Sequence, residues 1–190
     1  MAMHTELWFP NVIWSAMTHM IDNVELKRYA YQRQKEEKGR VISNVGGWQS
    51  NDIGLGEHPQ IDKLVTHLNT EIKECANQVG LPELVIQNLW ININPPNTYN
   101  ELHNHVGGVL SGVYYIDSIP EQGNIQFERT DNADCYMPTD VKNTYFTSIR
   151  CTYAAKTGAL YIFPSWLKHT VKINKTPNDR LSISFNYGEK

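Results

Sequence analysis

The chain has 190 residues, of which 41% are hydrophobic and 19% are charged, and its formal net charge is −3. This length and composition indicate one globular domain, residues 1–190, that can bury a sizeable core. The small negative charge excludes a general basic surface of the kind that attracts nucleic acid. No apolar run approaches the roughly 18 residues of a membrane-spanning helix, so no membrane partner is expected.

The first 82 residues are expected to form an opening extended segment and two helices. Residues 6–17 form the extended segment, which Pro10 interrupts. Asp22 can cap a first helix that runs to about Lys38 and ends at Gly39. We expect this N-terminal part to pack on the rest of the domain.

A long loop and a second helix follow. Residues 40–57 are rich in Gly, Asn and Ser, which is typical of a loop. From Pro59 to Val79, apolar residues recur at the i, i+3, i+4, i+7 spacing of one helix face. Gly80 supplies the expected C-terminal stop for this helix.

The character of the sequence changes to strand after Pro82, and residues 83–190 are expected to form a β-rich core. Seven short alternating segments lie close together with turn residues between them: 84–94, 109–116, 124–129, 144–153, 159–163, 169–173 and 180–186. That spacing favours a β-sandwich or a barrel of jelly-roll type. The fold class is therefore mainly β with N-terminal helices.

Two of these segments have an unusually polar second face. In residues 180–186, Arg180 and Ser182 lie on the face opposite Leu181 and Ile183. In the first strand, Asn92 shares its face with Trp90 and Asn94, although Asn is depleted in strands. A small-molecule site inside the barrel would explain both polar faces.

Three histidines predict a metal site in the same region. His103 and His105 form an H-x-H pair, and His169 follows the aromatic-rich segment 163–168. Neutral imidazole is the commonest metal ligand in proteins, and side chains at i and i+2 of an extended segment point the same way. Arg180 adds a fixed cation that suits an anionic co-substrate.

The C-terminal part resembles the double-stranded β-helix (jelly-roll, cupin-like) oxygenases that use Fe(II) and 2-oxoglutarate. It is more narrowly similar to a subgroup of short bacterial and phage proteins. The resemblance covers residues 84–187 well, and the N-terminal helices only loosely. It rests on these residues and segments: Asn92, Asn100, His103–His105, 110–116, 158–169 and 180–186, with 47–50 in the N-terminal part.

The resemblance implies a metal site with one departure from the family pattern. His103 and His169 correspond to the two histidine ligands of Fe(II). The family normally places Asp or Glu where His105 stands, so the site would hold the metal with three neutral imidazoles. Glu101, two residues before His103, is a minor candidate for a substitute carboxylate.

The resemblance also assigns the co-substrate. Arg180 would bind the far carboxylate of 2-oxoglutarate, helped by Ser182 and Tyr115. Asn92 would reach the metal-side carboxylate or keto oxygen, with Asn94 and Asn100 as weaker candidates. Dioxygen would be the second co-substrate, and the implied reaction is hydroxylation of a primary substrate that the sequence does not identify. Trp48 and Gln49 are candidate contacts to that substrate.

Two other classes stay open. A three-histidine zinc hydrolase would use the metal to activate water, but it leaves Arg180 without a role. A cupin-like metal-binding module would have no turnover at all.

The cysteines favour a reducing compartment. Cys75, Cys135 and Cys151 are odd in number and widely spaced, so no disulfide partner is expected. The first residues show no secretory signal. We therefore expect the cytoplasm, or the host cytoplasm for a phage-encoded chain.

Overall fold

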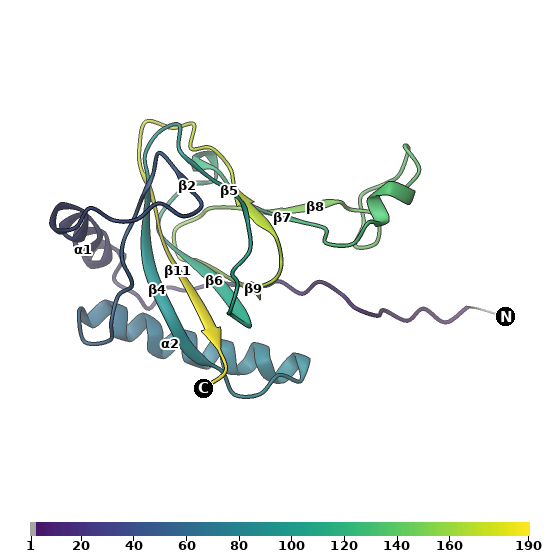
Figure 1. Cartoon of the computed structure of the whole chain (residues 1–190), viewed down its shortest axis with the longest axis horizontal. Coiled ribbons are helices and arrows are strands. Elements are labelled where there is room, and N and C mark those ends of the chain that lie inside the picture. Colours follow the sequence, from purple (N-terminus) through teal and green to yellow (C-terminus); the bar gives the residue numbers. More distant parts are fainter. Residues whose placement is uncertain (1–2) are drawn as a thin grey trace.

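Two β-sheets face each other across a cavity, and two helices cover the outer surface of the larger sheet (Figure 1). The computed structural model describes residues 3–190. All strand pairs are antiparallel. This arrangement is the expected double-stranded β-helix, and the two helices come from the N-terminal part of the chain.

Eleven strands make up the two sheets in the described part of the chain. The larger sheet contains, in spatial order, β1 (Trp14–Met17), β9 (Ala159–Pro164), β6 (Leu110–Asp117), β11 (Arg180–Gly188), β4 (Val85–Asn94) and β3 (Trp48–Gln49). The smaller sheet contains β2 (Asn44–Val45), β5 (Tyr99–His103), β10 (His169–Val171), β7 (Ile125–Glu128) and β8 (Arg150–Tyr153). Two short 3₁₀ turns, η1 (Pro120–Gln122) and η2 (Ala133–Tyr136), lie in the connections.

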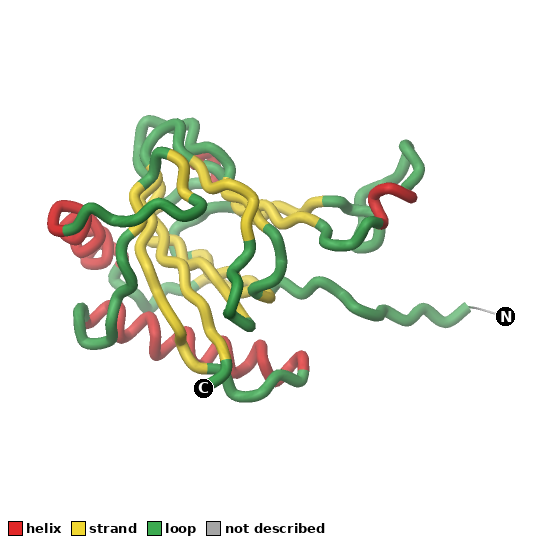
Figure 2. Tube along the Cα trace, in the orientation of Figure 1, coloured by secondary structure: helices red, strands yellow, loops and turns green. Residues whose placement is uncertain are grey.

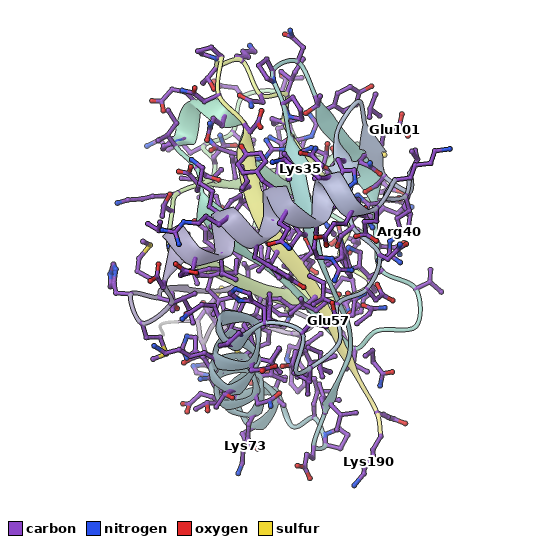
Figure 3. All side chains as sticks on the ribbon, turned by 90° about the vertical axis from the view of Figure 1, so that its left-hand side faces the viewer. Lys35, Arg40, Glu57, Lys73, Glu101 and Lys190 are labelled. Carbon is purple, nitrogen blue, oxygen red and sulfur yellow. The ribbon has the colours of Figure 1, made fainter. Side chains whose placement is uncertain are left out.

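The helices begin and end close to the positions that the sequence predicts. Helix α1 (Asn23–Glu36) is capped by the Asp22 carboxylate, which accepts hydrogen bonds from the backbone amides of Val24 and Glu25. Helix α2 (Pro59–Val79) ends at Gly80, whose φ of 74° is the left-handed conformation that glycine adopts without strain. Figure 2 shows both helices on the outside of the sheet, and in Figure 3 α1 crosses in front of the strands.

Alternation along the strands divides the interior into two parts. Leu89, Ile91 and Ile93 of β4 point outward and pack with the apolar faces of α1 and α2. The alternate residues of the same strand, such as Asn92, line the cavity between the sheets. A second, smaller apolar cluster joins the two sheets inside the barrel, with Tyr115 and Phe163 from the larger sheet and Phe127 from the smaller.

The structure corrects two of the expected elements and adds a strand that was not expected. Residues 40–57 are not entirely a loop, because β2 and β3 pair with β5 and β4. Residues 144–149 are not strand: the Thr144 hydroxyl accepts from the amides of Phe146 and Thr147 and closes a turn, so only β8 remains of the predicted strand 144–153. Strand β5 was not predicted, since its sequence does not alternate clearly.

The described residues include no helix that is both long enough and apolar enough to cross a membrane. The three cysteines are free, with Cys75 buried and the other two exposed. Of the opening segment 6–17, only β1 is paired into the sheet.

Candidate metal centre and anion pocket

A cavity of about 410 Å³ lies between the two sheets and contains both groups of candidate residues. Its walls come from the inward faces of β4, β6 and β11 in the larger sheet, and from β5, β7 and β10 in the smaller sheet. The three histidines line one part of it, and Arg180 lines another. The barrel therefore places residues from distant parts of the sequence around one space.

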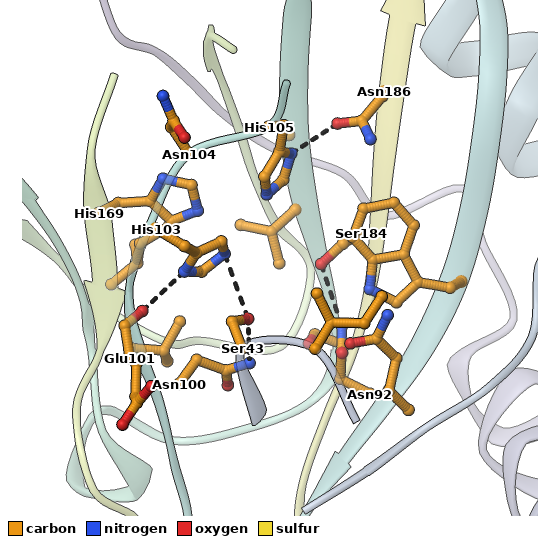
Figure 4. Close-up of a pocket in the computed structure, with 18 of the residues that line it drawn as sticks. Ser43, Asn92, Asn100, Glu101, His103, Asn104, His105, His169, Ser184 and Asn186 are labelled. Carbon is orange, nitrogen blue, oxygen red and sulfur yellow. Dashed lines mark hydrogen bonds between the residues drawn. The ribbon is translucent and has the colours of Figure 1, made fainter. Parts of the chain in front are cut away.

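The three histidines converge although 66 positions separate the first from the last. His103 ends β5 and pairs directly with His169, the first residue of β10. His105 lies two residues further along, outside the strand, and its ring returns to the other two. One ring nitrogen from each residue lies within 4.8 Å of those of the others, and Figure 4 shows the three rings facing a common point.

Hydrogen bonds to the Nδ1 atoms determine which nitrogen of each ring is free. His103 Nδ1 lies 2.7 Å from the backbone carbonyl of Glu101, and His169 Nδ1 lies 3.0 Å from that of Leu167. A carbonyl oxygen only accepts, so Nδ1 carries the proton in both rings. The Nε2 lone pairs are then available for a metal.

His105 also carries its proton on Nδ1, but here the hydrogen-bond partners are side chains. Its Nδ1 lies 2.5 Å from Oδ1 of Asn186 and 2.9 Å from the hydroxyl of Ser111. The amide oxygen of Asn186 accepts the proton of Nδ1 and leaves Nε2 free. All three imidazoles therefore present the nitrogen that a metal can use.

The environment keeps these imidazoles neutral. Burial lowers the pKa of His103, and burial lowers the pKa of His105 to about 4. Burial also lowers the pKa of His169 well below its usual value, and the two neighbouring histidines lower it further. A metal binding here does not have to displace protons at neutral pH.

Arg180 is the most deeply buried charged side chain of the cavity, with 1% of its surface exposed. Its Nη1 donates to the backbone carbonyls of Gln122, Gly123 and Lys172. Its Nη2 is buried and has no partner, and no carboxylate within residues 3–190 forms an ion pair with it. Because a buried unpaired charge is costly, this guanidinium indicates a site for an anion.

Three further predicted residues line the same cavity as Arg180. Ser182 lies next to it on the inward face of β11, directly opposite Tyr115 of β6. Burial raises the pKa of the Tyr115 phenol, and the charge of Arg180 opposes that rise. Asn92 lies opposite Ser182 on β4, and its Nδ2 donates to the hydroxyl of Ser184. Hydroxyl, phenol and amide groups thus accompany the cation.

The two candidate substrate contacts lie on opposite faces of β3. Gln49 is buried and lines the cavity. Trp48 does not line it: the ring packs against the core under the helices, and its Nε1 donates to the backbone carbonyl of Glu37. Adjacent strand residues point to opposite faces, so only one of the pair can reach the interior. The side chain of Glu101 is exposed and does not belong to the histidine group.

The cavity also contains residues that were not predicted from the sequence. The hydroxyl of Ser43 lies 3.4 Å from Nε2 of His103 and accepts from Nδ2 of Asn100 at 3.2 Å. Arg40 lines the cavity with its guanidinium 5.8 Å from the ring centre of Trp90. Ser43 and Arg40 belong to a segment that the sequence predicts to be a loop. Nothing in the sequence of that segment indicates that it lies near the interior of the barrel.

Comparison with known proteins identifies a family and several solved structures of similar fold. Residues 88–186 match a protein family described as "Putative 2OG-Fe(II) oxygenase". No curated protein sequence matches the chain significantly. Among solved structures, a prolyl-4-hydroxylase from Pseudomonas putida is similar with a TM-score of 0.68 and 15% identity, over 95% of this chain and 94% of that one.

Two further structures have the same fold. The epimerase SnoN from nogalamycin biosynthesis, solved with Fe3+, alpha ketoglutarate and nogalamycin RO, has a TM-score of 0.69 and 18% identity. The similarity covers 94% of this chain and 79% of SnoN. A viral collagen prolyl hydroxylase from Paramecium Bursaria Chlorella virus-1, solved with 2-oxoglutarate (2OG), has a TM-score of 0.61 and 13% identity, over 94% and 96% of the two chains.

Proposed function

We propose that this chain, which belongs to the family of 2OG-Fe(II) oxygenases, hydroxylates a primary substrate with iron and 2-oxoglutarate held in the cavity between its sheets. One observation carries the proposal. A group of three neutral imidazoles and a buried guanidinium with a free Nη2 line the same cavity, so a candidate cation site and a candidate anion site share one space.

The donor set fits a metal ion. We assign His103, His105 and His169 as the residues that would hold Fe(II) through their Nε2 atoms. Imidazole nitrogen suits iron among the first-row metals, and the fixed Nδ1 protons orient all three lone pairs. In this assignment His105 takes the place of the family's carboxylate, so the protein ligands contribute no negative charge to the site.

The surroundings of Arg180 fit a dicarboxylate such as 2-oxoglutarate. The free Nη2 would donate to the far carboxylate, and Ser182 and Tyr115 would donate to the same group. Asn92, which lies opposite Ser182 on the neighbouring strand β4, would contact the opposite end. The carbonyls around Nη1 fix the plane of the guanidinium before the ligand arrives.

When bound, the iron and 2-oxoglutarate supply the activation of dioxygen and the oxidation of a C–H bond, with succinate as a product. The chain itself would bind and orient these partners in the space between the sheets. We propose Gln49 as a contact for the primary substrate, because its side chain faces the cavity. Trp48 would not contact the substrate; its ring would only anchor β3 to the apolar core on the opposite face of the strand.

We also infer that residues 1–82 and 83–190 form one domain, because α1, α2 and the larger sheet share one apolar core. The three free cysteines favour a reducing compartment, and we propose the cytoplasm.

The proposed function is tested by succinate release from 2-oxoglutarate. Purified protein with Fe(II) is assayed against a panel of proline-containing peptides and small metabolites, since two of the similar structures are prolyl hydroxylases. His169→Ala serves as the blank. Substrate-dependent succinate in the wild type and none in the blank supports the proposal.

A three-histidine zinc hydrolase is the second candidate, because three imidazoles are also a catalytic zinc set. The two candidates differ in their need for 2-oxoglutarate. Addition of 2-oxoglutarate to the anaerobic Fe(II) protein should produce a visible charge-transfer band if the ketoacid chelates the metal. The absence of that band together with tight zinc binding would favour the hydrolase.

A further inference from the structure

We propose that Asn186 is a positioning residue that makes His105 a metal ligand by holding its Nδ1–H. This inference rests on the proposed function, since it concerns the same metal site. Asn186 lies on the inward face of β11, six residues after Arg180, and Figure 4 shows its amide oxygen directed at the His105 ring. It does not belong to the histidine group itself.

His105 differs from the other two histidines in how its ring is fixed. His103 and His169 hydrogen-bond to backbone carbonyls, which no side-chain substitution can remove. The ring of His105 depends on the side chains of Asn186 and Ser111. It also lies outside β5, so the ladder that aligns His103 with His169 does not align His105. Of the three proposed ligands, His105 is therefore the one whose ring must be oriented by other side chains.

The amide of Asn186 is itself held in one orientation. Its Nδ2 donates to Oδ1 of Asn88 at 2.8 Å, on the neighbouring strand β4. Its Oδ1 accepts from the hydroxyl of Ser111 at 2.7 Å. With the donor end committed to Asn88, only the acceptor end can face His105, and an acceptor there requires a proton on Nδ1. The Nε2 lone pair then faces the other two histidines.

Buried serine residues surround the hydrogen bond between Asn186 and His105. The hydroxyls of Ser111 and Ser165 lie 2.7 Å apart, and both residues are fully buried. The backbone amide of His105 donates to the carbonyl of Ser165 at 2.9 Å. Backbone and ring of His105 are thus both tied to the same small group of residues, which leaves the ring little freedom to turn away.

The choice of an amide at this position also has an electronic consequence. Metal-ligating histidines commonly donate their second nitrogen to a carboxylate or a carbonyl, and such partners raise ligand basicity. At 186 the partner is a neutral amide, in a site whose ligands are already neutral. An Asp at this position would bring a negative charge to the His105 ring and should tighten metal binding.

The test is anaerobic titration with Co(II), which reports the ligand geometry in its visible spectrum. Asn186→Leu keeps the size of the side chain and removes the acceptor. We expect Co(II) affinity to fall about 10- to 100-fold, with a changed spectrum, because loss of such partners has that effect on metal sites. Asn186→Asp should restore or exceed the wild-type affinity. Asn69→Leu is the matched control and should leave Co(II) binding unchanged, since Asn69 lies on α2, which covers the outer surface of the larger sheet, and accepts from the Tyr187 hydroxyl.

A metal-free readout separates positioning from general damage. Two-bond ¹H–¹⁵N correlations in the apo protein should report the Nδ1–H tautomer for His105 in the wild type and in Asn186→Asp, and a tautomer mixture in Asn186→Leu. If Asn186→Leu does not fold, Asn88→Ala replaces it: the amide of Asn186 then keeps only the hydrogen bond from the Ser111 hydroxyl, and a smaller loss of Co(II) affinity is expected. Wild-type affinity and spectrum in the folded Asn186→Leu protein, or in Asn88→Ala, would overturn the inference. Failure of the proposed metal site looks different, because Co(II) would then bind wild type and His169→Ala equally.

Discussion

His169 stands directly opposite His103 in the antiparallel pairing of β10 with β5, and their ring centres are 4.3 Å apart. One register position therefore joins two ligands that belong to different thirds of the sequence. The neighbouring strand β7 pairs with the other side of β10, placing Phe127 beside His169. Two of the three histidines, His103 and His169, therefore belong to paired strands, whereas His105 follows the end of β5.

Loss of a ligand is the first prediction. His169→Ala should weaken Fe(II) or Co(II) binding by more than the roughly 10- to 100-fold that loss of an outer partner costs. The reason is that one of three donor nitrogens is removed outright. Equilibrium dialysis under nitrogen measures the effect. Equal metal content in the variant and the wild type would contradict the metal assignment.

The second prediction concerns the guanidinium. Arg180→Lys keeps one positive charge, but a single ammonium cannot replace both Nη1, which donates to three backbone carbonyls, and the free Nη2. We expect 2-oxoglutarate to bind about 10- to 100-fold more weakly, corresponding to loss of one hydrogen bond to a charged group. A thermal-shift titration of the metal-loaded protein measures it, because a ligand that binds only the folded state raises Tm. Lys35→Gln, which removes an exposed charge, is the control and should behave as the wild type.

The third prediction restores the family's charge at the metal. His105→Asp would add a carboxylate ligand to two imidazoles, the usual facial set for Fe(II). The added negative charge should slow the loss of Fe(II) to a chelator such as ferrozine, whereas His105→Ala should speed it. Faster loss from His105→Asp than from His105→Ala would mean that position 105 does not face the metal.

A glycine that touches Arg180 gives the fourth prediction. At Gly123, φ is +94° and an added Cβ would lie 2.0 Å from the Lys172 carbonyl oxygen and 2.7 Å from Nη1 of Arg180. Gly123→Ala should therefore destabilise the protein by at least about 1–3 kcal/mol, the cost of a strained backbone residue. It should also weaken 2-oxoglutarate binding by displacing the guanidinium.

Gly80→Ala is the matched control for that experiment. Its φ is +74°, but an added Cβ there meets nothing within 4 Å. It carries the backbone strain without the clash, so urea unfolding should show a smaller loss of stability and 2-oxoglutarate affinity should not change. If the two variants changed 2-oxoglutarate affinity equally, Gly123 would have no specific role in positioning Arg180 for the anion.

Features of this protein that depend on residues close together in the chain could be predicted from its sequence. Asp22 and Gly80 mark the helix ends because capping involves residues within a few positions of each other. Alternation along β4 and β11 predicts which side chains face inward, because successive residues of a strand point to opposite sides. The candidate ligands and Arg180 came from residue types and from the family resemblance.

The places where those residues meet depend on contacts between distant segments and are seen only in the folded structure. The register of β10 against β5 brings His169 to His103, and no local pattern encodes a pairing between strands so far apart. The 40–47 segment brings Ser43 to the barrel only because β2 adds to β5. Asn186 faces His105 because β11 lies between β4 and β6, so that Asn88 and Ser111 hold its amide from both sides. Strand order and register arise from the packing of the whole chain, which is why local periodicity did not reveal these contacts.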